Sequence, residues 1–217
     1  MPSPLEKARQ APDSTKARIF YTARQLFGEY GYHGVTARMI AQAVGIDVST
    51  MYYHWGEKPD LYEAVLEDLD DQIRYKLKEI EKTVRGKDIG TRLAIAIDVM
   101  CDYLFAHPEA AKLLLQCYFS KTRTDDNFED RLTEHIANIA VAMGLALDRK
   151  AVTPQANARV LAVWNAVINF TAGEHFLRPM LELKTLDYRS VVKETLRFIL
   201  LPAFTGAERQ AQKDSRG

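Results

Sequence analysis

A cluster of hydroxyl, aromatic and basic residues lies between positions 36 and 58 of this 217-residue chain. Hydroxyl and cationic groups donate hydrogen bonds to phosphate oxygens, and short or aromatic side chains suit contacts with bases. The pattern favours two short helices, from Thr36 to Ala43 and from Asp47 to Tyr53, separated by Gly45. The second helix of such a pair is narrow enough to enter the major groove of DNA, which is about 12 Å wide.

The second short helix is predicted to have two different sides. Ile46, Met51 and part of Tyr52 supply apolar surface for a core, and Met39, Ile40 and Ala43 do the same for the first helix. The remaining side presents residues suited to touching bases and phosphates, namely Val48, Ser49, Thr50, Tyr53 and His54.

The same residues resemble the TetR (tetracycline repressor) family, whose pattern looks like T-x-R-x-I-A-x-x-x-G-V-S-x-x-T-L-Y-x-H-F-x-x-K-x-x-L. The resemblance covers residues 14–62 and departs at Asp47, where the family often has serine, and at Trp55, where it usually has phenylalanine. Asp47 can still cap a helix, and packing can absorb Trp55. The matching positions are Thr36, Arg38, Ile40-Ala41, Gly45-Ile46, Thr50-Met51-Tyr52, His54-Trp55, Lys58 and Leu61.

The resemblance implies a role for each residue of the cluster. The backbone N–H groups at the Thr36 helix start, Tyr52, His54 and Lys58 would hold phosphates, and Arg38 could reach a guanine edge. The contacts with bases that determine sequence specificity would be made by Val48, Ser49, Thr50 and Tyr53. Taken singly, Arg38 or Lys58 could be an ordinary solvated residue, and Trp55 is better read as a core aromatic.

The rest of the chain predicts an all-α protein of about nine helices. Ser14 can cap a first helix with an apolar face at Ile19, Ala23, Leu26, Phe27 and Tyr30, and amphipathic helices continue after Gly90. We expect a flexible tail over 1–13, a helix-turn-helix DNA-binding domain of three helices over 14–58, a larger ligand-binding and dimerisation domain over 59–206, and a C-terminal tail over 207–217.

Composition and motifs exclude several classes of protein. Lys+Arg and Asp+Glu both number 29, so net charge gives no bulk attraction to nucleic acid. With only Cys101 and Cys117 and no clustered Cys/His set, neither a disulfide framework nor a zinc site is expected. The chain shows no catalytic motif, signal peptide or apolar run of ~18 residues. We therefore predict a cytoplasmic protein that is not an enzyme, has no cofactor or metal, and has no membrane partner.

The family resemblance also implies an effector cavity among the middle helices and a homodimer. Aromatic, methionine and polar residues mingle there, as in a mostly apolar pocket, although an ordinary core has the same composition. Candidate ligand residues are Met100, Tyr103, Leu104, Tyr118, Phe119, Met143, Trp164, Asn165, Asn169, Phe170 and His175. The helices at 154–177 and 187–204 are the candidate dimer interface, where Asn165, Asn169 and His175 could alternatively make hydrogen bonds between subunits.

The sequence thus predicts a sequence-specific transcriptional regulator, a repressor that binds a palindromic double-stranded operator as a homodimer. A small, partly apolar effector would release it by favouring a conformation in which the helix near 59–84 tilts the DNA-binding heads. An activator or a ligand-independent regulator of the same fold is the first alternative. A helical enzyme or binding protein with a fortuitous N-terminal similarity is the second.

Overall fold

The computed structural model describes residues 2–119 and 125–214, with only the backbone for 125–127, 129 and 206–214. This part of the chain is helical and contains no β-strand, which confirms the predicted fold class. The elements are α1 (Pro4–Gln10), α2 (Thr15–Gly34), α3 (Ala37–Val44), α4 (Val48–Trp55), α5 (Lys58–Val84), α6 (Ile89–Ala106), α7 (Pro108–Phe119), α8 (Asp125–Ala142), the short 3₁₀ turn η1 (Arg149–Ala151), α9 (Pro154–Ala172), α10 (Glu174–Met180) and α11 (Thr185–Asp214).

Two helices account for the difference from the expected nine. Residues 1–13 were expected to form a tail, but Ser3 caps α1 and forms a reciprocal capping box with Glu6. Leu5 and Ala8 of this helix are buried. The helix expected over 154–177 ends at Ala172, and Gly173 separates it from α10. At the other end of the chain, α11 continues to Asp214, beyond the expected boundary at 206, and residues 215–217 lie outside the described chain.

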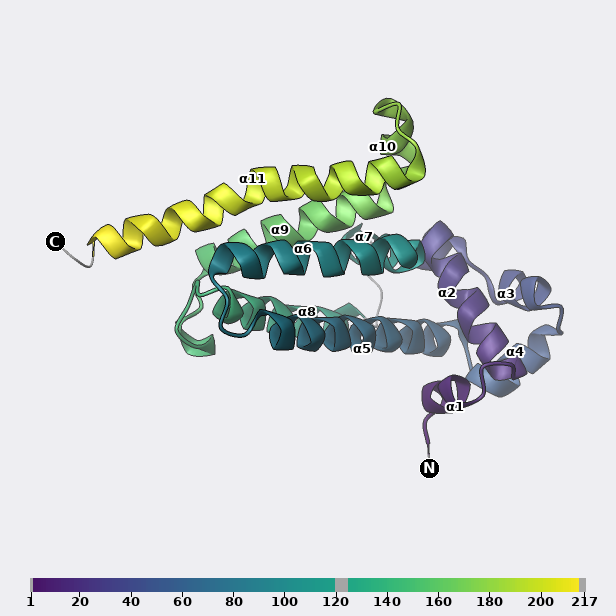
Figure 1. Ribbon diagram of the computed structural model, residues 1–217. Coiled ribbons are helices and arrows are strands. Elements are labelled where there is room, and N and C mark those ends of the chain that lie inside the picture. The colour runs from purple at the N-terminus through teal and green to yellow at the C-terminus, as the bar shows by residue number, and fades with distance from the viewer. Residues whose placement is uncertain (1, 120–124, 215–217) are drawn as a thin grey trace. The chain divides into compact units, whose positions relative to one another are not determined.

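The chain divides into two units that do not follow its linear order. The first unit consists of Met1–Ile73 with Glu109–Arg131, so it contains α1 to α4, the start of α5, and α7 (Figure 1). The second unit consists of Arg74–Pro108 with Leu132–Gly217 and contains α6, α9, α10 and α11.

The core of the first unit is built on aromatic side chains. Phe27 of α2 meets Tyr62 of α5 edge to face, with ring centroids 5.0 Å apart. Tyr32, at the kinked end of α2, lies 4.8 Å from the same tyrosine ring. Phe20 stacks on Trp55 of α4 at 5.4 Å. These contacts join α2 to the helices that follow it and explain why Phe20, Phe27 and Tyr62 are fully buried.

The second unit packs α6 against α9 and α11 (Figure 1). Leu93, Ile97 and Leu104 of α6 are buried, as are Val192 and Leu196 of α11. Their spacing of four or seven residues places each set on one helix face, as the sequence pattern predicted. None of the helices described is long and apolar enough to cross a membrane.

The close approach of α7 to α2 depends on Gly28. A Cβ atom at this position would lie 3.0 Å from the Glu109 carbonyl oxygen and 3.1 Å from Glu109 Cβ. Two backbones can come this near only where one side chain is missing. Gly28 lies inside α2 and serves this contact.

We predict that Gly28→Ala destabilises the protein by about 1–3 kcal/mol, although alanine is the better helix former, because the added methyl group must push α7 away. Urea unfolding would measure the change. Gln25→Ala, an exposed substitution on the same helix, is the control and should alter the free energy of unfolding by less than about 0.5 kcal/mol. Equal stability of the Gly28→Ala variant and the wild type would contradict the proposed constraint.

Candidate nucleic-acid interface

Helices α3 and α4 form a helix-turn-helix packed on α2. Thr36 caps α3 through its hydroxyl, which accepts from the N–H of Met39 at 3.2 Å. Helix α3 ends at Gly45, whose φ of 77° is the left-handed conformation that glycine adopts without strain. Asp47 occupies the N-cap position of α4 as expected, but its side chain makes no capping hydrogen bond.

One side of the helix pair is buried. Met51 is completely inaccessible, and Trp55 is buried with its Nε1–H donating to the Lys16 carbonyl oxygen at 2.9 Å. This confirms the interpretation of Trp55 as a core residue. In α3 the expected core position Ala43 is exposed, whereas Val44 is buried beside Ile40.

The other side of the pair carries the residues that the sequence singled out. Tyr53 is 86% exposed, an unusual position for a large aromatic side chain. Thr36, Arg38, Ser49 and Tyr52 are also exposed, and Val48, Thr50, His54 and Lys58 are half-buried. The structure therefore brings all these positions onto or beside one pair of short helices. The first N–H groups of α3 have no intrahelical acceptor, which makes this helix start suitable for a phosphate.

Three cationic side chains of the first unit bind backbone carbonyl groups at helix ends. Lys58 Nζ donates to the carbonyl oxygens of Tyr32 at 3.0 Å and Val35 at 2.9 Å. Arg18 Nη2 donates to the Val44 carbonyl at 2.6 Å, and Lys16 Nζ donates to that of His54. No local pattern could have indicated the Lys16 and Arg18 contacts, because their partners are 38 and 26 residues away.

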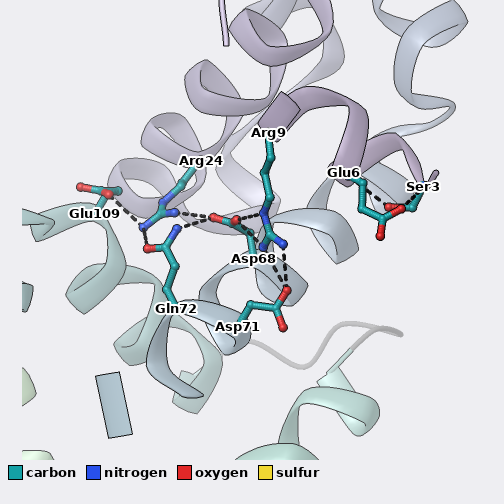
Figure 2. A network of polar contacts seen from close by, with 8 residues as sticks. All are labelled: Ser3, Glu6, Arg9, Arg24, Asp68, Asp71, Gln72 and Glu109. Atoms are coloured by element: carbon teal, nitrogen blue, oxygen red, sulfur yellow. Dashed lines mark hydrogen bonds and ion pairs between the residues drawn. The ribbon is translucent and has the colours of Figure 1, made fainter. Parts of the chain in front are cut away.

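A buried network of charges joins α2, α5 and α7 (Figure 2). Arg24 Nη1 lies 2.6 Å from Asp68 Oδ2, and Arg24 Nη2 lies 3.2 Å from Glu109 Oε1. Gln72 accepts from the same guanidinium at 3.1 Å and donates to Asp68 at 2.7 Å. The side chains of Arg24, Asp68 and Glu109 are at least 91% buried. Polar contacts within the network must therefore replace the hydrogen bonds that water would make to these charges.

Helix α1 extends this network to the N-terminus. Arg9 donates to Asp68 Oδ1 from Nε at 2.9 Å and from Nη2 at 2.6 Å, and it also pairs with Asp71 at 3.0 Å (Figure 2). Burial by itself would lower the pKa of Arg9, but the hydrogen bonds and ion pairs with Asp68 and Asp71 together outweigh it, so the pKa is raised. The Ser3-Pro4-Leu5-Glu6 sequence was the available signal for this helix, because it has the form of a capping box.

Comparison with known proteins connects this geometry to a family. The family model for bacterial regulatory proteins of the tetR family matches residues 19–65, from α2 into α5. The HTH-type transcriptional repressor AcnR of Corynebacterium efficiens is 25% identical over 142 residues, covering 64% of this chain and 68% of AcnR. The HTH-type transcriptional repressor SCO4008 of Streptomyces coelicolor is 27% identical over 146 residues, covering 67% of this chain and 71% of SCO4008. The helix-turn-helix region of this chain is therefore that of the tetR family of bacterial regulatory proteins.

A solved structure extends the similarity in fold beyond the helix-turn-helix. The ketosteroid transcriptional regulator KstR2 of Mycobacterium tuberculosis superposes with a TM-score of 0.66, covering 88% of this chain and 95% of KstR2 at 16% sequence identity. Sequence similarity at this level supports the fold alone. The family match and the transcriptional repressors among its relatives identify the chain as a DNA-binding transcriptional regulator.

The candidate ligand residues have different environments. Tyr118 and Phe119 belong to the first unit and are exposed, and the others belong to the second unit. Within the second unit Met100, Tyr103, Leu104 and Trp164 are buried, Met143, Asn165 and Phe170 are half-buried, and Asn169 and His175 are exposed.

The asparagines on α9 make local hydrogen bonds. Asn165 Nδ2 donates to the Leu161 carbonyl at 2.9 Å, and Asn169 Nδ2 donates to the Asn165 carbonyl at 2.8 Å. Trp164 differs, because its buried Nε1 has no hydrogen-bond partner within the described chain. The role of these residues toward a ligand stays a prediction.

We predict that Arg24→Met costs about 3–5 kcal/mol of unfolding free energy, since it removes the buried cation that Asp68 and Glu109 share. Arg9→Met is the matched control: this side chain is 37% exposed, and its loss should cost about 0–1 kcal/mol. Urea unfolding at one protein concentration would compare the two variants. Similar losses for both would show that burial does not set the importance of Arg24.

His54 should make the stability of this regulator sensitive to acid. Desolvation and the nearby Lys16 ammonium lower the pKa of His54 below its ordinary value of 6.5. As the pH falls below about 6.5, the His54 imidazole becomes protonated in the unfolded state before it does so in the folded state. The contribution of neutral His54 to the free energy of unfolding is therefore fully present above about pH 6.5 and is lost as the pH falls toward the folded-state pKa. We expect His54→Gln to lose less unfolding free energy than the wild type between about pH 7.5 and pH 5.5. Urea titrations at both pH values would show parallel losses if His54 were not responsible.

Proposed function

We propose that this TetR-family regulator is a repressor that binds a palindromic operator as a homodimer and is released by a small, partly apolar effector. The observation that carries base recognition is the exposed face of α4, where Tyr53 is 86% exposed while Met51 and Trp55 anchor the opposite face. Repression is supported by the names of AcnR and SCO4008, both described as transcriptional repressors.

The contacts proposed for DNA divide into two groups. Thr36, Tyr52 and His54 lie at or beside helix ends and suit phosphate oxygens, and Arg38 suits a guanine edge. Val48, Ser49, Thr50 and Tyr53 on α4 suit base edges, where methyl, hydroxyl and aromatic groups discriminate between base pairs. Because one helix reads only a few base pairs, two subunits on two half-sites provide the specificity that an operator needs.

The helices proposed for the dimer carry exposed apolar side chains. Phe198 on α11 is 82% exposed, and Ile199 beside it is also exposed. Phe176 and Met180 of α10 are exposed as well. Large exposed apolar residues on adjacent segments are typical of a surface that is covered by another protein. We therefore place the homodimer contact within 154–177 and 187–204, with α10 included.

The effector is proposed to bind in the second unit. Met100, Tyr103, Leu104 and Trp164 provide buried apolar and aromatic surface there, and the unpartnered Trp164 Nε1–H can donate to a polar group of a ligand. An effector that discriminates between two conformations by about 1–3 kcal/mol would change DNA affinity by roughly 5- to 150-fold.

The proposal is tested by binding the purified chain to its own upstream intergenic DNA and to a scrambled duplex of equal length across a salt series. Selective binding with two subunits per site supports the repressor proposal. Deleting the gene should then raise expression from a reporter carrying that DNA. A fall in expression would instead indicate an activator, and equal, weak binding to both duplexes would contradict recognition of this DNA.

We predict that Tyr53→Ala lowers affinity for the selected operator by about 1–3 kcal/mol, the discrimination typical of one good base contact. Tyr75→Ala is a matched control, because Tyr75 is a 68% exposed tyrosine on α5 outside the helix pair. Fluorescence anisotropy with the operator duplex measures both variants. If Tyr53→Ala and Tyr75→Ala change the affinity for the operator by the same amount, the α4 face does not read the bases.

A further inference from the structure

The first unit places a cation at the end of each of three helices. Lys58 binds two carbonyl groups after the Gly31 kink of α2, Arg18 binds the last carbonyl of α3, and Lys16 binds a carbonyl in the last turn of α4. The final carbonyl groups of a helix have no intrahelical donor and carry the negative end of its dipole. A cation at this position therefore satisfies backbone acceptors and fixes the position of the helix end.

Cations fix helix α3 in this way at both of its ends. Lys58 binds the carbonyl of Val35, and the next residue, Thr36, caps the start of α3. Arg18 reaches from α2 to Val44, the last residue of α3, at 2.6 Å. The two contacts leave α3 little freedom to slide or rotate against α2.

Helix α4 is fixed by a reciprocal pair of contacts with α2. Lys16 donates through Nζ to the His54 carbonyl, and the Trp55 indole donates back to the Lys16 carbonyl at 2.9 Å. The Lys16 ammonium also lies 5.0 Å from the centroid of the Trp55 ring. The turn that bears Tyr53 is therefore held from its buried side.

The two lysine ammonium groups are partly withdrawn from water. Lys58 Nζ lies 4.0 Å above the Tyr32 ring, and two of its three N–H donors are directed to carbonyl oxygens. Burial lowers the pKa of Lys58, and burial together with the Lys7 charge lowers that of Lys16. Its contacts with two carbonyl groups and with the Tyr32 ring leave Lys58 at most one N–H donor for the phosphate that the family resemblance implies.

We propose that Lys16, Arg18 and Lys58 are positioning residues, which orient α3 and α4 for base recognition through backbone carbonyl groups and do not neutralise phosphates. The inference rests on the proposed role of the α4 face in reading bases. Losing one of these cations misplaces the reading side chains without removing a counterion-releasing contact. Selectivity between duplexes should therefore fall while the salt dependence of binding stays the same.

The test compares Lys58→Met with the wild type on a duplex that the wild-type chain enriches from a random library, and on a scrambled duplex. Affinities are measured across about 50–200 mM salt, because each phosphate contact contributes a slope of about −0.9 in log K against log salt. Thermal melting by circular dichroism establishes that each variant is folded at the assay temperature. We expect selectivity to fall roughly 5- to 150-fold, the range of one base contact, with an unchanged slope.

Two further variants make the result decisive. Lys7→Met removes an exposed lysine of the same unit and controls for the loss of one charge, so it should resemble the wild type. Arg18→Met acts at the opposite end of α3 and should reproduce the pattern even if Lys58→Met does not fold.

A slope about 0.9 shallower in either positioning variant would overturn the proposal, since it indicates a lost phosphate contact. Unchanged selectivity in a folded variant would overturn it as well, because a purely stabilising cation would give that result. Failure of the wild-type chain to enrich any duplex would instead contradict the proposed operator recognition itself.

Discussion

The first unit depends on one buried cation, the guanidinium of Arg24. Removing a charge from water costs several kcal/mol, and this cost is offset only when opposite charges and hydrogen-bond partners surround the group together. Asp68 from α5 and Glu109 from α7 meet this requirement at 2.6 and 3.2 Å, so the two helices must reach α2 in one register. Gly28 permits the approach of α7, one helical turn from Arg24.

Helix α2 carries out two tasks with different side chains. Arg24 and Phe27 face the interior that it shares with α5 and α7, whereas Lys16 and Arg18 near its start bind the ends of α4 and α3. The helix that is fixed by the charge network therefore also sets the position of the DNA-reading pair. This arrangement relates the core of the unit to the orientation of Tyr53 without requiring that any core residue touch DNA.

Local chemistry was predicted well where the signal lies within a few residues. Ser14 and Thr36 cap α2 and α3 as expected, and Gly45 ends α3 in the left-handed conformation. A signal of the same kind was present for α1, where Ser3 and Glu6 form a capping box. The many polar residues and prolines around it led instead to the prediction of a tail. Burial of Leu5 and Ala8 against the rest of the unit explains why that short helix is present.

The helical class, the helix-turn-helix and the residues on its exposed face could all be predicted from the order of the residues, because periodicity, caps and glycine turns act over short distances along the chain. Which charged side chains meet depends on how the helices pack in the folded chain. Arg24 and Asp68 are 44 residues apart, and Lys58 is 26 residues from Tyr32, so no spacing pattern could join them. A lysine or arginine looks the same in sequence whether it faces water, a phosphate or a carbonyl group, and the three-dimensional packing of the helices selects among these partners.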